Sequence, residues 1–110
     1  KRAPSGYTAS TYSTVRVLLD TAREVKSLET DKVTRALEGR KFQYLKGPEE
    51  TRACDHVNIQ QVFLCKGKSA AAMKDAWDYY DIVQAVGGPV VAESCEGEGF
   101  DPGKPLSAQI

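Results

Sequence analysis

The stretch from residue 30 to residue 67 constrains the fold most, because helix, turn and strand signals follow one another in it without a break. A short helix is predicted from Thr30 or Asp31, either of which can cap it, to Leu37, and Gly39 is suited to a left-handed stop. Turn signals at Lys-Gly-Pro and Asp-His separate predicted extended segments at residues 42–45, 49–54 and 59–66. This order of elements predicts α/β or α+β architecture, without the repeated βαβ units of a complete doubly wound sheet.

Apolar residues at helical spacing predict an amphipathic helix of about five turns over residues 9–26, ahead of this stretch. We expect its apolar side chains to face the core: Tyr12, Val15, Leu18, Leu19, Ala22 and Val25. Residues 77–86 predict a final strand, whereas Gly, Pro, Ser and Glu dominate from Gly87 onward. We therefore divide the chain into a folded segment, residues 1–86, and a Gly/Pro-rich tail, residues 87–110, that needs another surface to pack against.

Length and charge exclude several classes of protein. The 110 residues suffice for one small domain, and 15 basic residues balance 15 acidic ones. This balance leaves no electrostatic footprint for nucleic acid or for an anionic membrane. The apolar runs are far shorter than the roughly 20 residues that span a bilayer. We therefore expect a globular part of a protein that has no nucleic-acid partner.

No residue pattern in the sequence predicts catalysis, a metal site or a cofactor. His56 is the only histidine, and the preceding Cys54 and Asp55 suggest a nucleophile beside a base. Neighbouring side chains of an extended segment point to opposite faces, so a turn in which Asp55 or His56 bonds nearby backbone is the better interpretation. Glu49 and Glu50 are interpreted as a solvated strand edge rather than a general acid/base pair. We therefore expect a protein that is not an enzyme and has no catalytic or metal-binding residue.

Tyr7 is the side chain whose position favours binding. It lies in Pro-Ser-Gly-Tyr-Thr, residues 4–8, just before the long helix. Binding side chains concentrate on such approaches, where a scaffold holds the end of an element. An aromatic ring there offers an apolar wall and one hydroxyl to a small ligand. A hydrophobic staple against the first helical turn is the alternative interpretation.

The order of five short motifs carries a family resemblance. They are Pro4 to Tyr12, Ala36-Leu37-Glu38-Gly39, Gly47-Pro48, Arg52-Ala53-Cys54-Asp55-His56 and Gln60 to Gly67. In this order the chain resembles the C-terminal portion of type I periplasmic solute-binding proteins, in the leucine/isoleucine/valine-binding branch of ABC transporter substrate-binding proteins. The later segment 78–83 resembles the last strand of that family, so the resemblance covers roughly residues 4–90.

The resemblance implies the C-terminal part of a two-lobed α/β fold, with helices packed on a mixed sheet and lobes that close around a ligand by hinge motion. The chain would be roughly the final third of such a protein. The implied function is capture of a small amino-acid-like or organic solute for an ABC importer, in the periplasm or cell envelope. Its partners would be the importer's membrane subunits and the remaining N-terminal part of the two-lobed protein. The alternative is an accessory or structural subunit of an envelope complex, built on a repurposed binding-protein fold.

Within this resemblance, Tyr7 matches an aromatic position that flanks the ligand's side chain in relatives. We expect Tyr7 to contact the ligand, with Gly6 and Thr8 as weaker neighbours, and we expect Tyr12 in the core. Glu49 and Glu50 replace residues that are apolar or Thr in the family, so their strand is expected to be more exposed or covered by another chain.

Three cysteines form an odd set without a Cys-x-x-Cys pair, which permits one internal disulfide and one spare thiol. Cys54 and Cys65 lie on the two strands that flank the Asp-His turn and would approach each other if those strands pair. The oxidising periplasm implied by the resemblance allows such a bond. Cys95 in the tail is the alternative partner, and the sequence leaves the pairing open.

Overall fold

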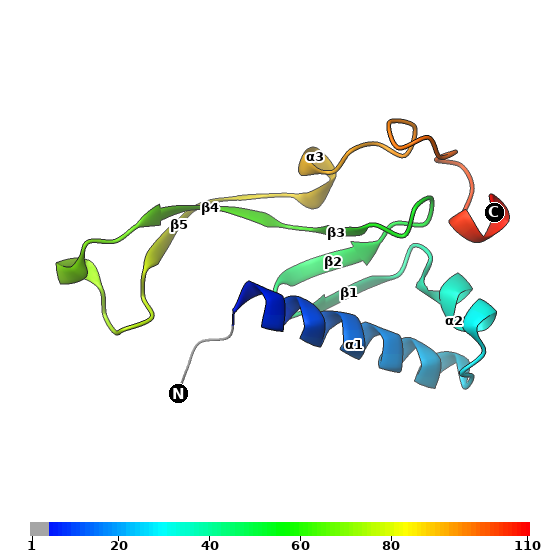
Figure 1. The fold of residues 1–110 in the computed structure, drawn as a ribbon, viewed down its shortest axis with the longest axis horizontal. Helices are drawn as coiled ribbons and strands as arrows, with labels where there is room; N and C mark the ends of the chain where they lie inside the picture. The colour runs from blue at the N-terminus through cyan, green and yellow to red at the C-terminus, as the bar shows by residue number, and fades with distance from the viewer. Residues whose placement is uncertain (1–4) are drawn as a thin grey trace.

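The computed structural model describes residues 5–110 (Figure 1). Helices and strands alternate irregularly along the chain, as a mixed architecture requires. The elements are α1 (Gly6–Val25), α2 (Thr30–Leu37), β1 (Lys41–Tyr44), β2 (Gly47–Thr51), β3 (Asn58–Gln60), β4 (Val62–Gly67), β5 (Tyr80–Val86) and α3 (Gly88–Val91), with 3-10 turns at Ala70–Ala72 and Leu106–Ala108. The predicted mixture of helices and sheet is confirmed. No helix within residues 5–110 is long and apolar enough to cross a membrane.

The extent of α2 agrees with the prediction, but its cap does not: the N-cap residue is Glu29, and neither Thr30 nor Asp31 caps the helix. The helix covers Thr30–Leu37, and Gly39 has a φ of 73°, the left-handed conformation that ends a helix most easily at glycine. The predicted strand at residues 59–66 differs, because it breaks at Gln61 into β3 and β4. β3 joins β1 and β2 in an antiparallel sheet, whereas β4 pairs only with β5.

β2 is the central strand of the three-stranded sheet, whose order is β1-β2-β3. The prediction of an exposed, edge-like strand is therefore wrong, and so is the solvated environment expected for Glu49. The Glu49 side chain is buried, with an ion pair of 2.9 Å to Lys46 and a hydrogen bond of 2.9 Å from Asn58. Pairing on both sides of β2 brings these partners over the carboxylate, because cross-strand neighbours share a face.

Helix α1 packs against the sheet along β1 (Figure 1). Tyr44 donates a hydrogen bond of 2.8 Å to Asp20, and both guanidinium nitrogens of Arg40 lie 2.7 Å from the Glu24 carboxylate. Hydrogen bonds from Tyr44, and then from Arg16, hold the pKa of Asp20 below its ordinary value. Polar contacts therefore orient the helix on the strand.

The face of α1 that is buried differs from the predicted one. Ser13, Val17 and Thr21, spaced by four residues, are buried. Four of the six residues expected in the core are between 44% and 59% exposed, namely Tyr12, Val15, Leu18 and Leu19, and the other two, Ala22 and Val25, are half-buried. The hydrophobic periodicity identifies the apolar face of α1. Whether that face is buried depends on the elements that pack on it, and nothing within residues 5–110 covers the apolar face of this helix.

The core is small for a chain of this length. Among the described residues, the buried apolar side chains are those of Val17, Val33 and Cys54. The molecule is only 15 Å thick along its shortest axis, and the β4–β5 hairpin extends away from the sheet as an arm with exposed strands (Figure 1). This part of the chain leaves much apolar surface, on α1 and on the arm, open to a further layer.

The tail is fastened to the folded segment. Cys54 and Cys95 form a disulfide, so the alternative pairing is the one present and the Cys54–Cys65 pairing is wrong. Cys65 faces solvent on β4, whose partner β5 holds no cysteine, and it is a free thiol. The Cys54 sulfur is consequently unable to act as a nucleophile.

The Asp-His turn also holds the tail. The Asp55 carboxylate accepts a hydrogen bond of 3.0 Å from the Val57 backbone, which confirms the turn interpretation. His56 Nε2 lies 3.0 Å from Glu38, whose carboxylate also accepts two hydrogen bonds of 2.8 Å from Ser107. Burial acts to raise the pKa of Glu38, but these hydrogen bonds outweigh burial and keep that pKa below its ordinary value.

Candidate functional site

The start of α1 and the end of the sheet enclose a hollow of about 560 Å³. Gly6 and Tyr7 line it from the first turn of α1, and Lys46 lines it from the turn between β1 and β2. Gln60, Gln61 and Phe63 complete it where β3 passes into β4. We call this cavity the α1 hollow. It joins an apolar wall to amide and ammonium groups, a combination typical of sites for small polar molecules.

Two of the three residues predicted to bind a ligand line the α1 hollow, and the third does not. Tyr7 is 88% exposed, so its ring is available and does not form a hydrophobic staple on the helix. Thr8 instead takes part in the helix cap: the N-cap residue Ser5 accepts a hydrogen bond of 3.2 Å from the Thr8 backbone N–H, and the two hydroxyl oxygens lie 3.0 Å apart. Contact between Tyr7 and a ligand stays a prediction.

The floor of the α1 hollow is polar, and the sequence interpretation missed it. The Lys46 side chain is only 18% exposed; its ammonium pairs with Glu49 at 2.9 Å and donates to Gln60 Oε1. The tight turn places Lys46 two residues after Tyr44 and directly before Gly47, whose φ of 93° suits glycine. The sequence did contain a signal for this ion pair, because Lys46 stands three residues before Glu49 with the Gly-Pro turn between them.

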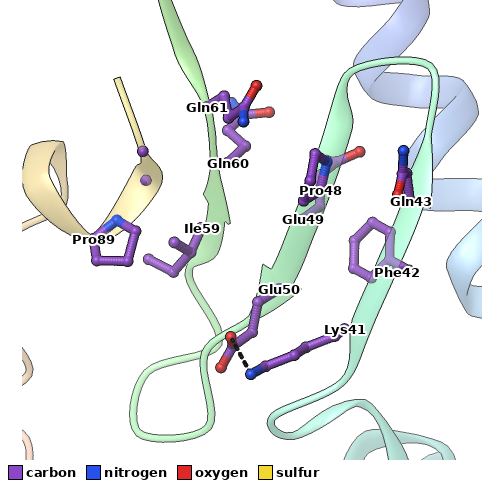
Figure 2. A pocket seen from close by; sticks show the side chains of 12 residues that line it. Lys41, Phe42, Gln43, Pro48, Glu49, Glu50, Ile59, Gln60, Gln61 and Pro89 are labelled. Atoms are coloured by element: carbon purple, nitrogen blue, oxygen red, sulfur yellow. Dashed lines mark ion pairs between the residues drawn. The ribbon is translucent and has the colours of Figure 1, made fainter. Parts of the chain in front are cut away.

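A second hollow, of about 570 Å³, lies on the other face of the sheet, beneath Pro89 (Figure 2). Lys41, Glu50 and Ile59 are cross-strand partners and share this face. Its ion pair, Lys41 to Glu50 at 3.7 Å, is open to solvent, with the lysine side chain 79% exposed. Exposed pairs of this kind contribute little, so the α1 hollow, with its buried polar floor, is the better candidate.

The described part of the chain, residues 5–110, brings together no group of three or more His, Cys, Asp or Glu side chains that could hold a metal ion. What the lining of the α1 hollow does offer a ligand is amide groups for hydrogen bonding, one ammonium group and an aromatic wall. These groups can hold a small molecule by shape and polarity.

Comparison with known proteins agrees with this architecture. The sequence model of the periplasmic binding protein family matches residues 1–72. The structure is similar to an amino acid ABC transporter substrate-binding protein from Pseudomonas fluorescens Pf-5, with 29% identity, a TM-score of 0.78 and coverage of 86% of this chain and 24% of that one.

A periplasmic binding protein from Burkholderia mallei shares the fold, with 24% identity, a TM-score of 0.79 and coverage of 97% of this chain and 26% of that one. No curated protein matches the chain. The chain thus spans about a quarter of the length of these two structures, less than the third expected. It belongs to the periplasmic binding protein family and has the fold of part of a two-lobed type I member.

Proposed function

We propose that this chain is part of an extracytoplasmic protein that captures a small amino-acid-like or organic solute for an ABC importer, and that the α1 hollow contacts the solute. The observation that carries the proposal is the exposed ring of Tyr7 beside the half-buried polar side chains of Lys46 and Gln60. The similar protein from Pseudomonas fluorescens, named for amino acid transport, supports this class of solute. A periplasmic location is proposed on the same family grounds.

The remaining part of the two-lobed protein is the proposed partner of this chain. Large apolar side chains stay exposed along α1 and the arm, among them Leu19 at 59%, Leu64 at 58% and Ile82 at 65%. Surfaces of this kind mark interfaces with protein. We propose that the other segments cover them, with residues 1–86 in one lobe and residues 87–110 as its attached tail. Closure of the lobes by hinge motion would then enclose Tyr7.

Replacing Tyr7 by Ala in the complete protein is expected to weaken binding of the cognate solute about ten- to a hundredfold, because burial of an aromatic side chain contributes about 1.5–3 kcal/mol. Isothermal titration calorimetry measures the affinity, after a thermal-shift screen of amino acids has identified the solute. Stability should be unchanged, since the ring is 88% exposed.

Two further variants serve as controls for this experiment. Tyr7→Phe keeps the ring and reports on the hydroxyl alone. Thr8→Ala keeps the backbone hydrogen bond to Ser5 and alters a side chain that does not line the α1 hollow, so its affinity should match the wild type. Equal affinities for Tyr7→Ala and the wild type would show that the ring does not touch the solute.

A further inference from the structure

We propose that Lys46, together with Gln60, determines the specificity of the α1 hollow by binding an uncharged oxygen of the solute, such as that of a carboxamide or hydroxyl group. This inference rests on the proposed function, since it assumes that a solute occupies the hollow. The inference specifies which kind of solute atom meets Lys46 and Gln60.

The first step is the number of hydrogens on the ammonium group. A lysine ammonium has three N–H donors. Lys46 uses one toward Glu49 Oε2, at 2.9 Å, and one toward Gln60 Oε1. No partner within residues 5–110 takes the third, although Lys46 lines the hollow and is mostly buried. In the open hollow water can accept from this third N–H, and once the lobes close over the hollow the donor needs an acceptor from the solute.

The second step concerns Gln60. Its oxygen accepts from Lys46, which fixes the side-chain amide so that its NH₂ is left to donate. That NH₂ has no acceptor in the described part of the chain, and Gln60 lines the same hollow. Two donors, Lys46 from the turn between β1 and β2 and Gln60 from β3, therefore lie side by side in the lining of the hollow.

The third step is the charge balance beneath the floor. Glu49 has a fully buried side chain, and it compensates the charge of Lys46. A solute carboxylate would add a second negative charge beside this neutral pair, and closure of the lobes over the hollow would make that charge costly by removing its water. An aliphatic end would leave both donors without acceptors. An uncharged oxygen avoids both penalties, so the floor discriminates against carboxylate and hydrocarbon alike.

The pair is held in place by its surroundings. Asn58 donates to the same carboxylate oxygen of Glu49 that Lys46 contacts, at 2.9 Å, so the acceptor cannot turn away from the ammonium. The hairpin between β1 and β2 is closed by the register Tyr44 to Gly47, which fixes the backbone of Lys46. A donor held this way discriminates between ligands more sharply than a mobile one.

The test uses the complete protein and two sets of solutes of similar shape: asparagine, aspartate and leucine, and the longer glutamine, glutamate and methionine. In the better-binding set, the wild type is expected to bind the amide at least tenfold more tightly than the acid and the aliphatic member, as measured by calorimetry. Either competitor binding as tightly as the amide would overturn the inference while leaving the proposed function intact. If none of the six binds, amides and alcohols found in a wider thermal-shift screen of small organic solutes are compared in the same way with their acid and aliphatic analogues, and a screen without any binder would instead overturn the proposed function.

The variant that tests Lys46 is Lys46→Met combined with Glu49→Met, which removes the donor without leaving a buried charge unpaired and without adding a new N–H. It is expected to reduce the preference for the amide over the aliphatic solute to within about threefold. The control is Lys41→Met, on the other face of the sheet, which should keep the full preference. A preference for the amide that remains tenfold in the double variant contradicts the assignment of specificity to Lys46. Tyr7→Ala separates a loss of specificity from a general loss of affinity, because it is expected to weaken the binding of every solute alike.

Discussion

The double variant Cys54→Ser/Cys95→Ser is expected to lower the free energy of unfolding by about 4 kcal/mol, because the disulfide closes a loop of 41 residues in the unfolded chain. The tail would also lose its covalent connection to the Asp-His turn. Urea unfolding of the complete protein, followed by the fluorescence of Trp77, measures the change. Under non-reducing conditions, we expect the double variant to unfold at a lower urea concentration than the wild type, which keeps its disulfide.

Cys65→Ser is the matched control, since Cys65 is a free and exposed thiol. Its unfolding curve should coincide with that of the wild type. Adding a reductant should destabilise the wild type and Cys65→Ser alike and leave the double variant unaffected. If Cys65→Ser were as unstable as the double variant, Cys65 and not Cys95 would be the partner of Cys54.

Gly88→Ala is expected to destabilise the protein by about 1–3 kcal/mol through overpacking. A Cβ at this position would lie 2.5 Å from the Ile59 side chain, and 2.7 and 2.8 Å from the backbone oxygen and nitrogen of Gln60. Backbone atoms cannot move aside as a flexible side chain can, so α3 must shift away from β3. Urea unfolding reports the loss, and hydrogen exchange at the Gln60 amide reports whether β3 is disturbed.

The adjacent Gly87→Ala provides a direct comparison, because nothing lies within 4 Å of a Cβ built there. This neighbour should be neutral or slightly stabilising, since alanine restricts the unfolded chain more than glycine does. Equal stability of the two variants would mean that α3 does not pack on β3 as described.

Elements whose signals are local could be predicted from the sequence. The length of α2 and the positive φ of Gly39 depend on residues a few positions apart, although the predicted cap by Thr30 or Asp31 is wrong. Tyr7 is expected just before a helix that begins at residue 9, but Ser5 caps α1 earlier, so Tyr7 lies in the first turn of the helix. The family resemblance depended on the order of such local motifs.

Features that depend on distant partners could not be predicted. Glu49 is buried because β2 has a strand on each side, a fact of topology that its own polar sequence conceals. The pairing of Cys54 with Cys95 depends on how the tail returns to the sheet. The buried face of α1 depends on neighbours, so its hydrophobic periodicity alone pointed to the wrong side chains.

The fastening of the tail has a mechanical consequence for the arm. Residues 55–94, which include β3, the arm and α3, form a loop whose two ends are joined by the Cys54–Cys95 bond. The arm is attached to the sheet on one side through β3, which β4 follows after Gln61, and on the other side through α3, which packs on β3 (Figure 1). A displacement of the arm is therefore expected to act first on β3, which lines the α1 hollow through Gln60.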